Sequence, residues 1–284
     1  MAADPEREAW FSYFWPGTEV LRNTLDIRDP VLLDRVEHKQ TALGEEAIKS
    51  GEVAVGGKTS AQRLSSIHST LFGEVYPWAG EYRTVNMQKG SHGFGDHNSM
   101  GMYMRQLDGA INRFDWDSAS FNEKVDKLGE LHTDLNFAHP FREGNGRTSR
   151  LFMADLAGKH GVELNFDEVD KPTWNEASAA TYLDPAGIRM DPTPMQEVYR
   201  RISAPSTPSS PQDTATSGPD SGPEVQLTAE QYRGVEAPEL SALEPDTGEA
   251  VDNRPSRSPN SSPVSGDHGP SAGMDDSHGA DFEL

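Results

Sequence analysis

The stretch HPFREGNGRTSR, residues 139–150, decides the local fold and the chemistry that it can support. Apolar residues recur at helical spacing on both sides of it, in residues 121–140 and again in residues 147–161. Pro140 disfavours continuation of the first helix past His139. Gly144 and Gly146 are typical of a tight turn. The stretch therefore predicts a helix end, a short loop and a new helix start.

The turn and the second helix together favour binding of an anion. Gly144, Asn145 and Gly146 let main-chain N–H groups face a ligand without a bulky side chain in the way. The first turn of the following helix adds unpaired N–H groups and partial positive charge, which suit phosphate. Arg147 and Arg150 are three positions apart and are expected on one helix face. Two guanidinium groups beside a glycine-rich turn predict a cradle for a polyphosphate.

Two more side chains in the stretch suit the chemistry of a bound nucleotide. Mg²⁺ binds through one or two carboxylates together with phosphate oxygens of the substrate, so Glu143 is a candidate ligand. Histidine is the residue whose ordinary pKa suits a general base near neutral pH, which makes His139 the candidate base. The arrangement predicts transfer of part of a nucleotide to a hydroxyl group. No Walker-type phosphate loop, G-x-x-x-x-G-K-[ST], occurs in the chain.

The bulk composition excludes several classes of protein. The chain has 284 residues and a formal net charge of -21, which argues against direct recognition of nucleic acid. It has no cysteine, so disulfides and cysteine-ligated zinc are excluded. Its start does not resemble a signal peptide, and no window is apolar enough to predict a membrane span. We expect a cytoplasmic protein, although export by a specialised secretion machine would leave no mark of this kind.

The composition changes near residue 202. Residues 203–284 contain 15 acidic but 3 basic residues, and 11 of the 20 prolines. Such a segment cannot bury enough apolar surface to offset the entropy of ordering it, so we predict a disordered tail. We divide the chain into an N-terminal extension packed on the core (1–40), a helical domain (41–202) and the tail (203–284).

Helical periodicity covers most of the first 202 residues. The predicted helices span residues 30–50, 60–76, 99–115, 121–140, 147–161, 170–183 and 192–203. Between Trp78 and Met100 the pattern changes to alternation at residues 82–87, followed by a stretch rich in Gly, His and Asn. This change predicts a short hairpin or extended flap. The fold class is therefore mainly α, with one small β element.

Three separated segments resemble the Fic family in the expected order. HPFREGNGRTSR matches the family signature HxFx(D/E)GNGRxxR at every defined position. VYPWAGEYRTVNMQKG (75–90) is similar to the segment that leads into the Fic flap, and FWPGTEVLRNTLDIRDP (14–30) to the N-terminal region of bacterial Fic proteins. The resemblance covers roughly residues 13–200. It implies a Fic-type helical bundle with a short β-hairpin flap over the active site.

The resemblance also implies an activity and a set of residue roles. Most characterised family members transfer AMP from ATP to a Ser, Thr or Tyr hydroxyl of a target protein and release pyrophosphate. By position, His139 would be the base and Glu143 the Mg²⁺ ligand. The nucleotide-binding residues would be Gly144, Asn145, Gly146, Arg147, Thr148 and Arg150, with Lys89 and Gly90 of the flap approaching the nucleotide. A target protein would add an extended segment to the flap by β-augmentation.

One family element lacks a clear counterpart. Many members carry an inhibitory helix, [S/T]xxxE[G/N], whose Glu pairs with the last Arg of the signature. Thr41 to Glu45 fits its first part, but Glu46 stands where Gly or Asn is expected, and the segment reads as a core helix. The resemblance then favours the toxin-type class of Fic protein. In that class a separate small antitoxin supplies the glutamate opposite Arg150.

Several alternatives stay open at this stage. A Doc-like protein kinase is disfavoured by Gly146, because that branch departs from GNGR at the second glycine. A non-AMP Fic transferase, a hydrolase that removes AMP, and an inactive adaptor module are the other readings. For His132 we predict a packed or surface histidine and not a metal ligand, for Trp174 and Tyr182 core packing, and for His92 and His97 a solvated loop.

Overall fold

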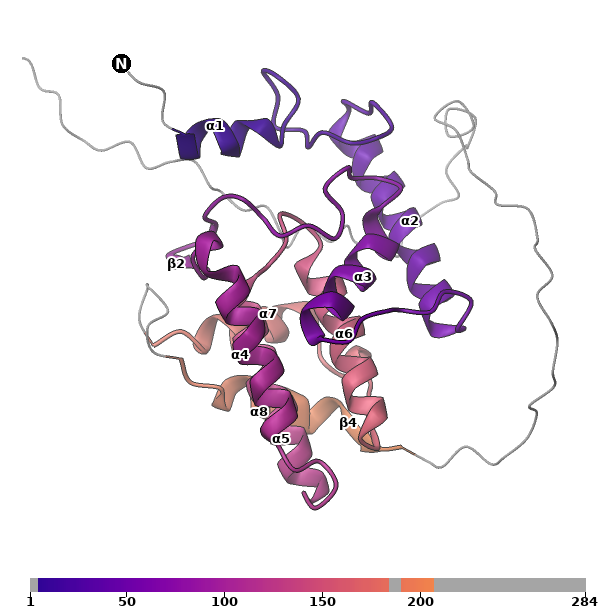
Figure 1. Ribbon diagram of the computed structural model, residues 1–284, viewed down its shortest axis with the longest axis vertical. Coiled ribbons are helices and arrows are strands. Elements are labelled where there is room, and N and C mark those ends of the chain that lie inside the picture. The colour runs from indigo at the N-terminus through magenta and orange to yellow at the C-terminus, as the bar shows by residue number, and fades with distance from the viewer. Residues whose placement is uncertain (1–4, 184–189, 207–284) are drawn as a thin grey trace, which may run out of the picture. The chain divides into compact units, whose positions relative to one another are not determined.

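The structure is a computed structural model that describes residues 5–183 and 190–206 (Figure 1). All of these residues belong to one compact unit. Eight α-helices make up most of the described chain, which confirms the prediction of a mainly α fold. They are α1 (Pro5–Ser12), α2 (Pro30–Lys49), α3 (Ser60–Phe72), α4 (Met100–Arg113), α5 (Phe121–Ala138), α6 (Asn145–Lys159), α7 (Lys171–Ala180) and α8 (Thr193–Ile202).

Most of the long helices begin at a polar cap that is visible in the sequence. The side chains of Asp29, Thr59, Ser120 and Asp170 each accept a hydrogen bond from a main-chain N–H in the first turn of the helix that follows. Helix α6 differs, because its cap is Gly144, whose φ is 76° and which offers no side chain. The first turn of α6 is therefore left without a side-chain cap.

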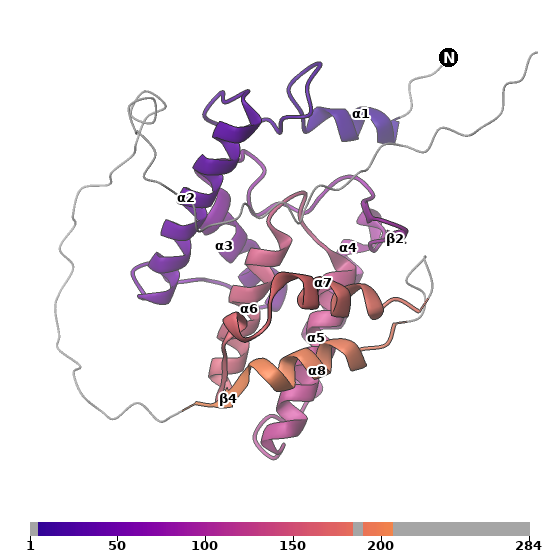
Figure 2. The same cartoon turned by 180° about the vertical axis from the view of Figure 1, so that it is seen from behind.

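Helix α5 contacts α4, α6 and α8, and α3 contacts α2, α4 and α6 (Figures 1 and 2). Their apolar faces form one continuous core, as the helical periodicity predicts. The largest fully buried side chains include Tyr199, Phe72, Phe141, Leu64 and Leu131. Phe141 lies in the α5–α6 loop, so the loop that carries the candidate chemistry is anchored directly in this core.

The N-terminal extension does pack on the core, but it is not separated from it at residue 40. Helix α2 runs through that position without a break. Val20 and Ile27, which precede α2, belong to the same buried cluster as the helical core. Helix α1, which the sequence does not predict, leads into a second small cluster built on Tyr13, Val85 and Met87.

Two short antiparallel sheets complete the fold. Strand β3 (Val162–Leu164) pairs with β4 (Ser203–Pro205), with Val162 opposite Pro205 and Leu164 opposite Ser203. The predicted start of the tail at residue 203 is therefore wrong, because β4 belongs to the folded domain. The remaining tail, residues 207–284, lies outside the described residues.

The predicted hairpin is present but shorter than the alternating pattern indicates. Strand β1 (Gln88–Lys89) pairs with β2 (His92–Gly93), and Gly90 turns the chain with a φ of 59°. Residues 82–87 form no strand. Their alternation instead reflects side chains such as Val85 and Met87 that are buried against the segment after α1. Two short 3₁₀ helices, η1 (His97–Ser99) and η2 (Phe166–Glu168), lie elsewhere in the domain.

Within the described ranges, no helix combines the length and the apolar character that crossing a lipid bilayer requires.

Candidate active site

His139 ends helix α5 in a left-handed conformation. Its φ and ψ are 44° and 62°, and its N–H donates to the Leu135 carbonyl at 3.0 Å. The imidazole is mostly buried and stacks on the Phe94 ring, with centroids 3.7 Å apart and planes 9° apart. Residues other than glycine adopt a positive φ only at a cost, and such residues are common at functional sites. The candidate base is thus held by a turn on one side and by the chain beyond the flap on the other.

The glycine-rich turn is packed too tightly for larger residues. A methyl group at Gly144 would lie 2.2 Å from the Phe72 ring, and the positive φ of Gly144 is unfavourable for a side chain as well. Asn145 is buried, and its amide both accepts from the Phe141 N–H and donates to the Phe141 carbonyl, each at 2.8 Å. Gly146 is exposed at the start of α6. The Asn145 side chain therefore braces the loop, and the main chain at Gly146 remains accessible.

Glu143 is fixed from the main chain. His68 is fully buried between the rings of Phe72 and Phe141, with centroid distances of 4.7 and 3.9 Å. Its Nδ1 accepts from the Gly80 N–H at 2.8 Å, so Nε2 carries the proton and donates to the Glu143 carbonyl at 2.9 Å. The Glu143 carboxylate accepts from the Gly144 N–H at 3.1 Å. The sequence gives no sign of this role for His68, because the partners are far apart along the chain.

Arg147 contacts helix α2. Its guanidinium donates to the Glu37 carboxylate at 2.5 Å and to the Thr41 hydroxyl at 3.3 Å, and it lies over the Phe72 ring. Glu37 is buried and also accepts from the Tyr76 hydroxyl. Burial, followed by the Glu37 charge, raises the pKa of Tyr76, so its hydroxyl stays a donor. A phosphate that binds Arg147 would therefore compete with the Glu37 carboxylate for the guanidinium. The sequence alone does not indicate this contact.

Arg150 lies in a different environment from Arg147. It is exposed, and none of the described carboxylates forms an ion pair with it. Its charge acts on His132 of α5, which is buried, and no described group forms a hydrogen bond with the Nδ1 atom of that histidine. Arg147 and Arg150 therefore have different neighbours, although their spacing predicts that they lie on one helix face. Arg150 is the one whose guanidinium is open to a ligand.

Thr148 cannot reach a ligand from solvent. Its exposed fraction is 0%, and its hydroxyl has no hydrogen-bond partner among the described residues. Thr148 is the fourth residue of α6, and its side chain points into the core. Its role in nucleotide binding stays a prediction.

The flap residues Lys89 and Gly90 lie at the exposed tip of the β1–β2 hairpin. Their approach to a nucleotide stays a prediction. His92 of the hairpin lies against Tyr182, with ring centroids 4.9 Å apart. His132 and Trp174 pack together at 5.0 Å. His132, Trp174 and Tyr182 thus have packing contacts, as predicted, while His92 is less solvated than expected.

The Thr41 to Glu45 segment has no inhibitory geometry. Thr41 is buried, and its hydroxyl accepts a hydrogen bond from Arg147. Glu45 forms an ion pair at 2.6 Å with Lys49, one turn further along α2. Within the described ranges, no group of three or more metal-binding side chains gathers that could hold an ion by itself. Glu143 would therefore need phosphate oxygens or water as further ligands for a cation, as Mg²⁺ usually does.

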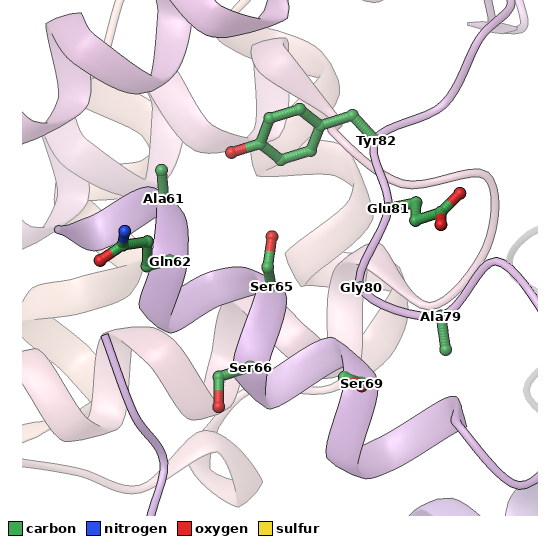
Figure 3. A pocket seen from close by; sticks show the side chains of 9 residues that line it. All are labelled: Ala61, Gln62, Ser65, Ser66, Ser69, Ala79, Gly80, Glu81 and Tyr82. Carbon is green, nitrogen blue, oxygen red and sulfur yellow. The ribbon is translucent and has the colours of Figure 1, made fainter. Parts of the chain in front are cut away.

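An open groove of about 730 Å³ lies on α3 (Figure 3). It is lined by serines 65, 66 and 69 and by the segment from Ala79 to Tyr82. None of its lining residues belongs to residues 139–150. The groove therefore does not add a group to the candidate chemistry.

Comparison with known proteins places this site in a family. Residues 58–157, which include the whole α5–α6 loop and most of α6, match the Fic/DOC family. This segment of the chain is a Fic/DOC domain. The signature residues His139 to Arg150 of this Fic domain lie at a helix end, a turn and a helix start, as the sequence pattern predicts.

Several curated relatives of this Fic domain are named as adenylyltransferases. Protein adenylyltransferase VbhT of Bartonella schoenbuchensis is 33% identical over 171 residues, which cover 60% of this chain and 35% of that protein. The probable protein adenylyltransferase Fic of Escherichia coli is 27% identical over 197 residues, covering 67% and 90%. The chain thus matches about a third of VbhT and nearly all of the shorter relative. These names indicate an adenylyltransferase type of enzyme at the level of the family.

Solved structures support the fold. BepC of Bartonella tribocorum, described as a VirB-translocated effector with bound AMPPNP, aligns with a TM-score of 0.61 at 23% identity, covering 69% of this chain and 98% of that one. A Fic domain from Bartonella quintana with bound ADP aligns with a TM-score of 0.61 at 25% identity, covering 69% and 95%. Adenine nucleotides are thus bound by proteins that share this fold.

Proposed function

We propose that this chain is a protein adenylyltransferase, which moves AMP from ATP to a Ser, Thr or Tyr hydroxyl of a target protein. The observation that carries the proposal is the junction of α5 and α6. It holds a histidine in a left-handed turn, a half-buried carboxylate, and a helix start that has no side-chain cap and bears an exposed arginine. The names of the relatives supply the reaction class.

The reaction assigns one task to each group. His139 takes the proton of the target hydroxyl as its oxygen bonds to the α-phosphorus, and the bond from that phosphorus to the bridging oxygen of pyrophosphate breaks. Negative charge on the phosphate oxygens is stabilised by the main-chain N–H groups at the start of α6 and by Arg150. Glu143 would hold Mg²⁺, which supplies charge neutralisation at the phosphates when bound. Asn145 and His68 keep the loop in shape.

The Glu37 contact suggests how Arg147 takes part. A nucleotide phosphate would have to share Arg147 with Glu37, because that carboxylate already binds the guanidinium in the buried space between α2 and α6. We assign Arg147 the role of fixing Glu143, whose carboxylate lies 3.9 Å away, with any phosphate contact being secondary.

The restraint of the enzyme is a further part of the proposal. The exposed Arg150 without a carboxylate partner in the described part of the chain supports a toxin-type Fic protein. A separate small antitoxin would supply that glutamate. Isolation of the chain from its native host should yield a complex with a small protein that carries this glutamate on a helix. Recovery of the free, fully active chain would reject this part alone.

The reaction class is tested with ATP labelled at either the α- or the γ-phosphate. The full chain is incubated with cell lysate and Mg²⁺, and labelled proteins are resolved by mass. We expect label from the α-position only. Label from the γ-position only would support the Doc-like kinase reading. Absence of transfer together with specific partner binding would favour an adaptor.

Two variants make this test specific for the site. His139→Ala should lower transfer by roughly 100-fold or more, because a general base commonly contributes that much, while ATP affinity stays near that of the wild type. His38→Ala removes a partly exposed histidine on α2 and should leave transfer unchanged. Equal transfer by His139→Ala and the wild type would reject the assignment of the base.

The cellular location remains a prediction. Several structural relatives are described as VirB-translocated effectors, and this supports testing export as well as a cytoplasmic role.

A further inference from the structure

A buried arginine outside the signature connects the flap to the catalytic histidine. Arg83 is 2% exposed and lies between α3 and the flap in sequence. In the described part of the chain, every hydrogen bond that its guanidinium donates ends on a main-chain carbonyl. Burial lowers the pKa of Arg83 to about 10, so the side chain is still charged at neutral pH. A buried cation without an ion pair is costly, which argues that these four contacts have a purpose.

The four acceptors lie on two different segments. Nη1 donates to the Val85 carbonyl at 2.6 Å and Nη2 donates to the Gly95 carbonyl, and these residues flank the hairpin on its two sides. Nε donates to the His139 carbonyl at 2.7 Å, and Nη2 also reaches the Ala138 carbonyl at 3.2 Å. One side chain therefore joins both stems of the flap to the end of α5.

Main-chain and ring contacts reinforce the same junction. The Arg83 N–H donates to the Pro140 carbonyl, and the Gly95 N–H donates to the Phe137 carbonyl, each at 2.8 Å. Phe94, next to Gly95, stacks on the His139 imidazole. The orientation of this imidazole thus depends on where the flap stem is held.

The acceptors on α5 are groups that need a partner. The last carbonyls of a helix have no N–H within the helix to bind, and they carry partial negative charge that a cation stabilises. His139 also adopts a left-handed conformation, which is unfavourable for a residue with a side chain. A planar guanidinium with five donors can bind several carbonyls at once, whereas a lysine ammonium cannot reproduce that geometry.

We propose that Arg83 is the positioning residue that holds His139 in its catalytic orientation and fastens both stems of the flap to it. Arg83 acts through the main chain of His139 and through Phe94, and it does not touch the substrate. The proposal rests on the proposed function for the role of His139. The contacts that Arg83 makes can be tested without it.

The matched pair of variants is Arg83→Lys and Arg63→Lys in the full chain. Arg63 also uses its guanidinium as a two-pronged donor, to the Asp155 carboxylate at 2.5 Å, but it joins α3 to the far part of α6. Both variants keep the charge and lose the planar group. A purely structural role would lower stability in both and leave the catalytic parameters in proportion to the folded fraction.

For Arg83→Lys we expect the kcat of AMP transfer to fall on the order of 100-fold, as for a catalytic group displaced by about 1 Å. The KM for ATP and its equilibrium Kd should stay within about threefold, because the α6 start is intact. Arg63→Lys should keep the kcat of the wild type. Wild-type kcat in Arg83→Lys, or an equal loss in both variants, would overturn the proposal.

Two readouts do not depend on activity. In Arg83→Lys, hydrogen exchange should become faster in two segments, residues 84–96 and residues 136–141. In Arg63→Lys, exchange in both segments should stay as in the wild type. The ring-current shift that the Phe94 ring causes at the imidazole protons of His139 should also decrease. If the wild type transfers no label, the proposed function fails, while these two readouts still decide whether Arg83 holds the junction.

A measurement on the wild type covers the case in which Arg83→Lys does not fold. The amides of Arg83 and Gly95, which donate across the junction, should then open with the same free energy in native-state hydrogen exchange. Independent opening of the Gly95 amide at lower free energy would contradict the proposal.

Discussion

His132 shows how a single buried residue can set the electrostatics behind a site. It lies between Trp174 and Tyr199, with ring centroids 5.0 and 5.6 Å away. Burial, and then the positive charge of Arg150, lower the pKa of His132 to about 4. The imidazole is therefore neutral at physiological pH, and Arg150 meets no second positive charge from behind.

The low pKa of His132 predicts a pH dependence of stability. Between about pH 6.5 and pH 4 the unfolded chain binds a proton at this histidine that the folded chain does not bind. The free energy of unfolding should therefore fall as the pH is lowered, by up to about 1.4 kcal/mol per pH unit from this group. Urea unfolding of wild type and His132→Asn at pH 7, 6 and 5 measures the slope, which should be smaller in the variant.

His38→Asn is the control for this prediction, since the His38 side chain is 40% exposed and, among the described residues, its ring contacts Asp34 one turn earlier in α2. Its slope should match that of the wild type. Identical slopes in all three proteins would show that His132 does not contribute to the acid sensitivity.

At the scale of elements, α1 and the turn after it act on the catalytic loop through aromatic rings. The guanidinium of Arg142, inside the signature, lies 4.5 Å from the Trp10 ring, 5.1 Å from Phe14 and 5.6 Å from Tyr13. The Tyr13 hydroxyl also accepts from the Thr84 N–H at 3.1 Å. The N-terminal segment therefore contacts the loop and the base of the flap together.

Trp10→Ala should loosen this contact. Loss of one cation–π interaction and of part of the buried ring surface should lower the free energy of unfolding by about 1–3 kcal/mol. Hydrogen exchange should increase in residues 5–22 and in residues 139–146. Phe11→Ala, which removes a neighbouring ring that is 51% exposed, is the control and should change stability by less than about 0.5 kcal/mol. Similar effects of both variants would indicate that α1 is not docked on the loop.

At the scale of the whole molecule, the last described elements close the core. Helix α8 buries Met195, Val198, Tyr199 and Ile202, and its main neighbour is α5. Strand β4 then pairs with β3, and the Ser206 N–H donates to the Gly161 carbonyl at 3.1 Å. The folded domain thus extends a few residues past the point where the composition changes.

This boundary predicts the outcome of truncation. A chain ended after Ser206 should unfold cooperatively at the melting temperature of the full chain, because every described core residue is retained. A chain ended after Asp191 lacks α8 and should not fold, since several fully buried side chains are missing. Thermal unfolding followed by circular dichroism measures both. A large loss of stability on removing residues 207–284 would show that this segment contributes to the domain.

Much of the architecture was predictable because its signals are local. Helices α2 to α8 follow from apolar spacing and from caps such as Asp29 and Ser120, which act within a few residues. Helix α1 is short and has no buried residue of its own, so no periodic pattern marks it. The alternation at residues 82–87 was misleading, because a contact with the segment after α1 produces the same pattern as a strand.

The sequence alone determined the order of the site: a histidine at a helix end, a carboxylate, a glycine turn and a helix start with arginines. These features depend on backbone preferences within twelve residues. Only the tertiary structure decided what holds each group. Glu37 lies 110 positions from Arg147, and Arg83 lies 56 positions from His139. Such contacts arise when packing of the core removes water from both partners, and no local sequence pattern indicates them.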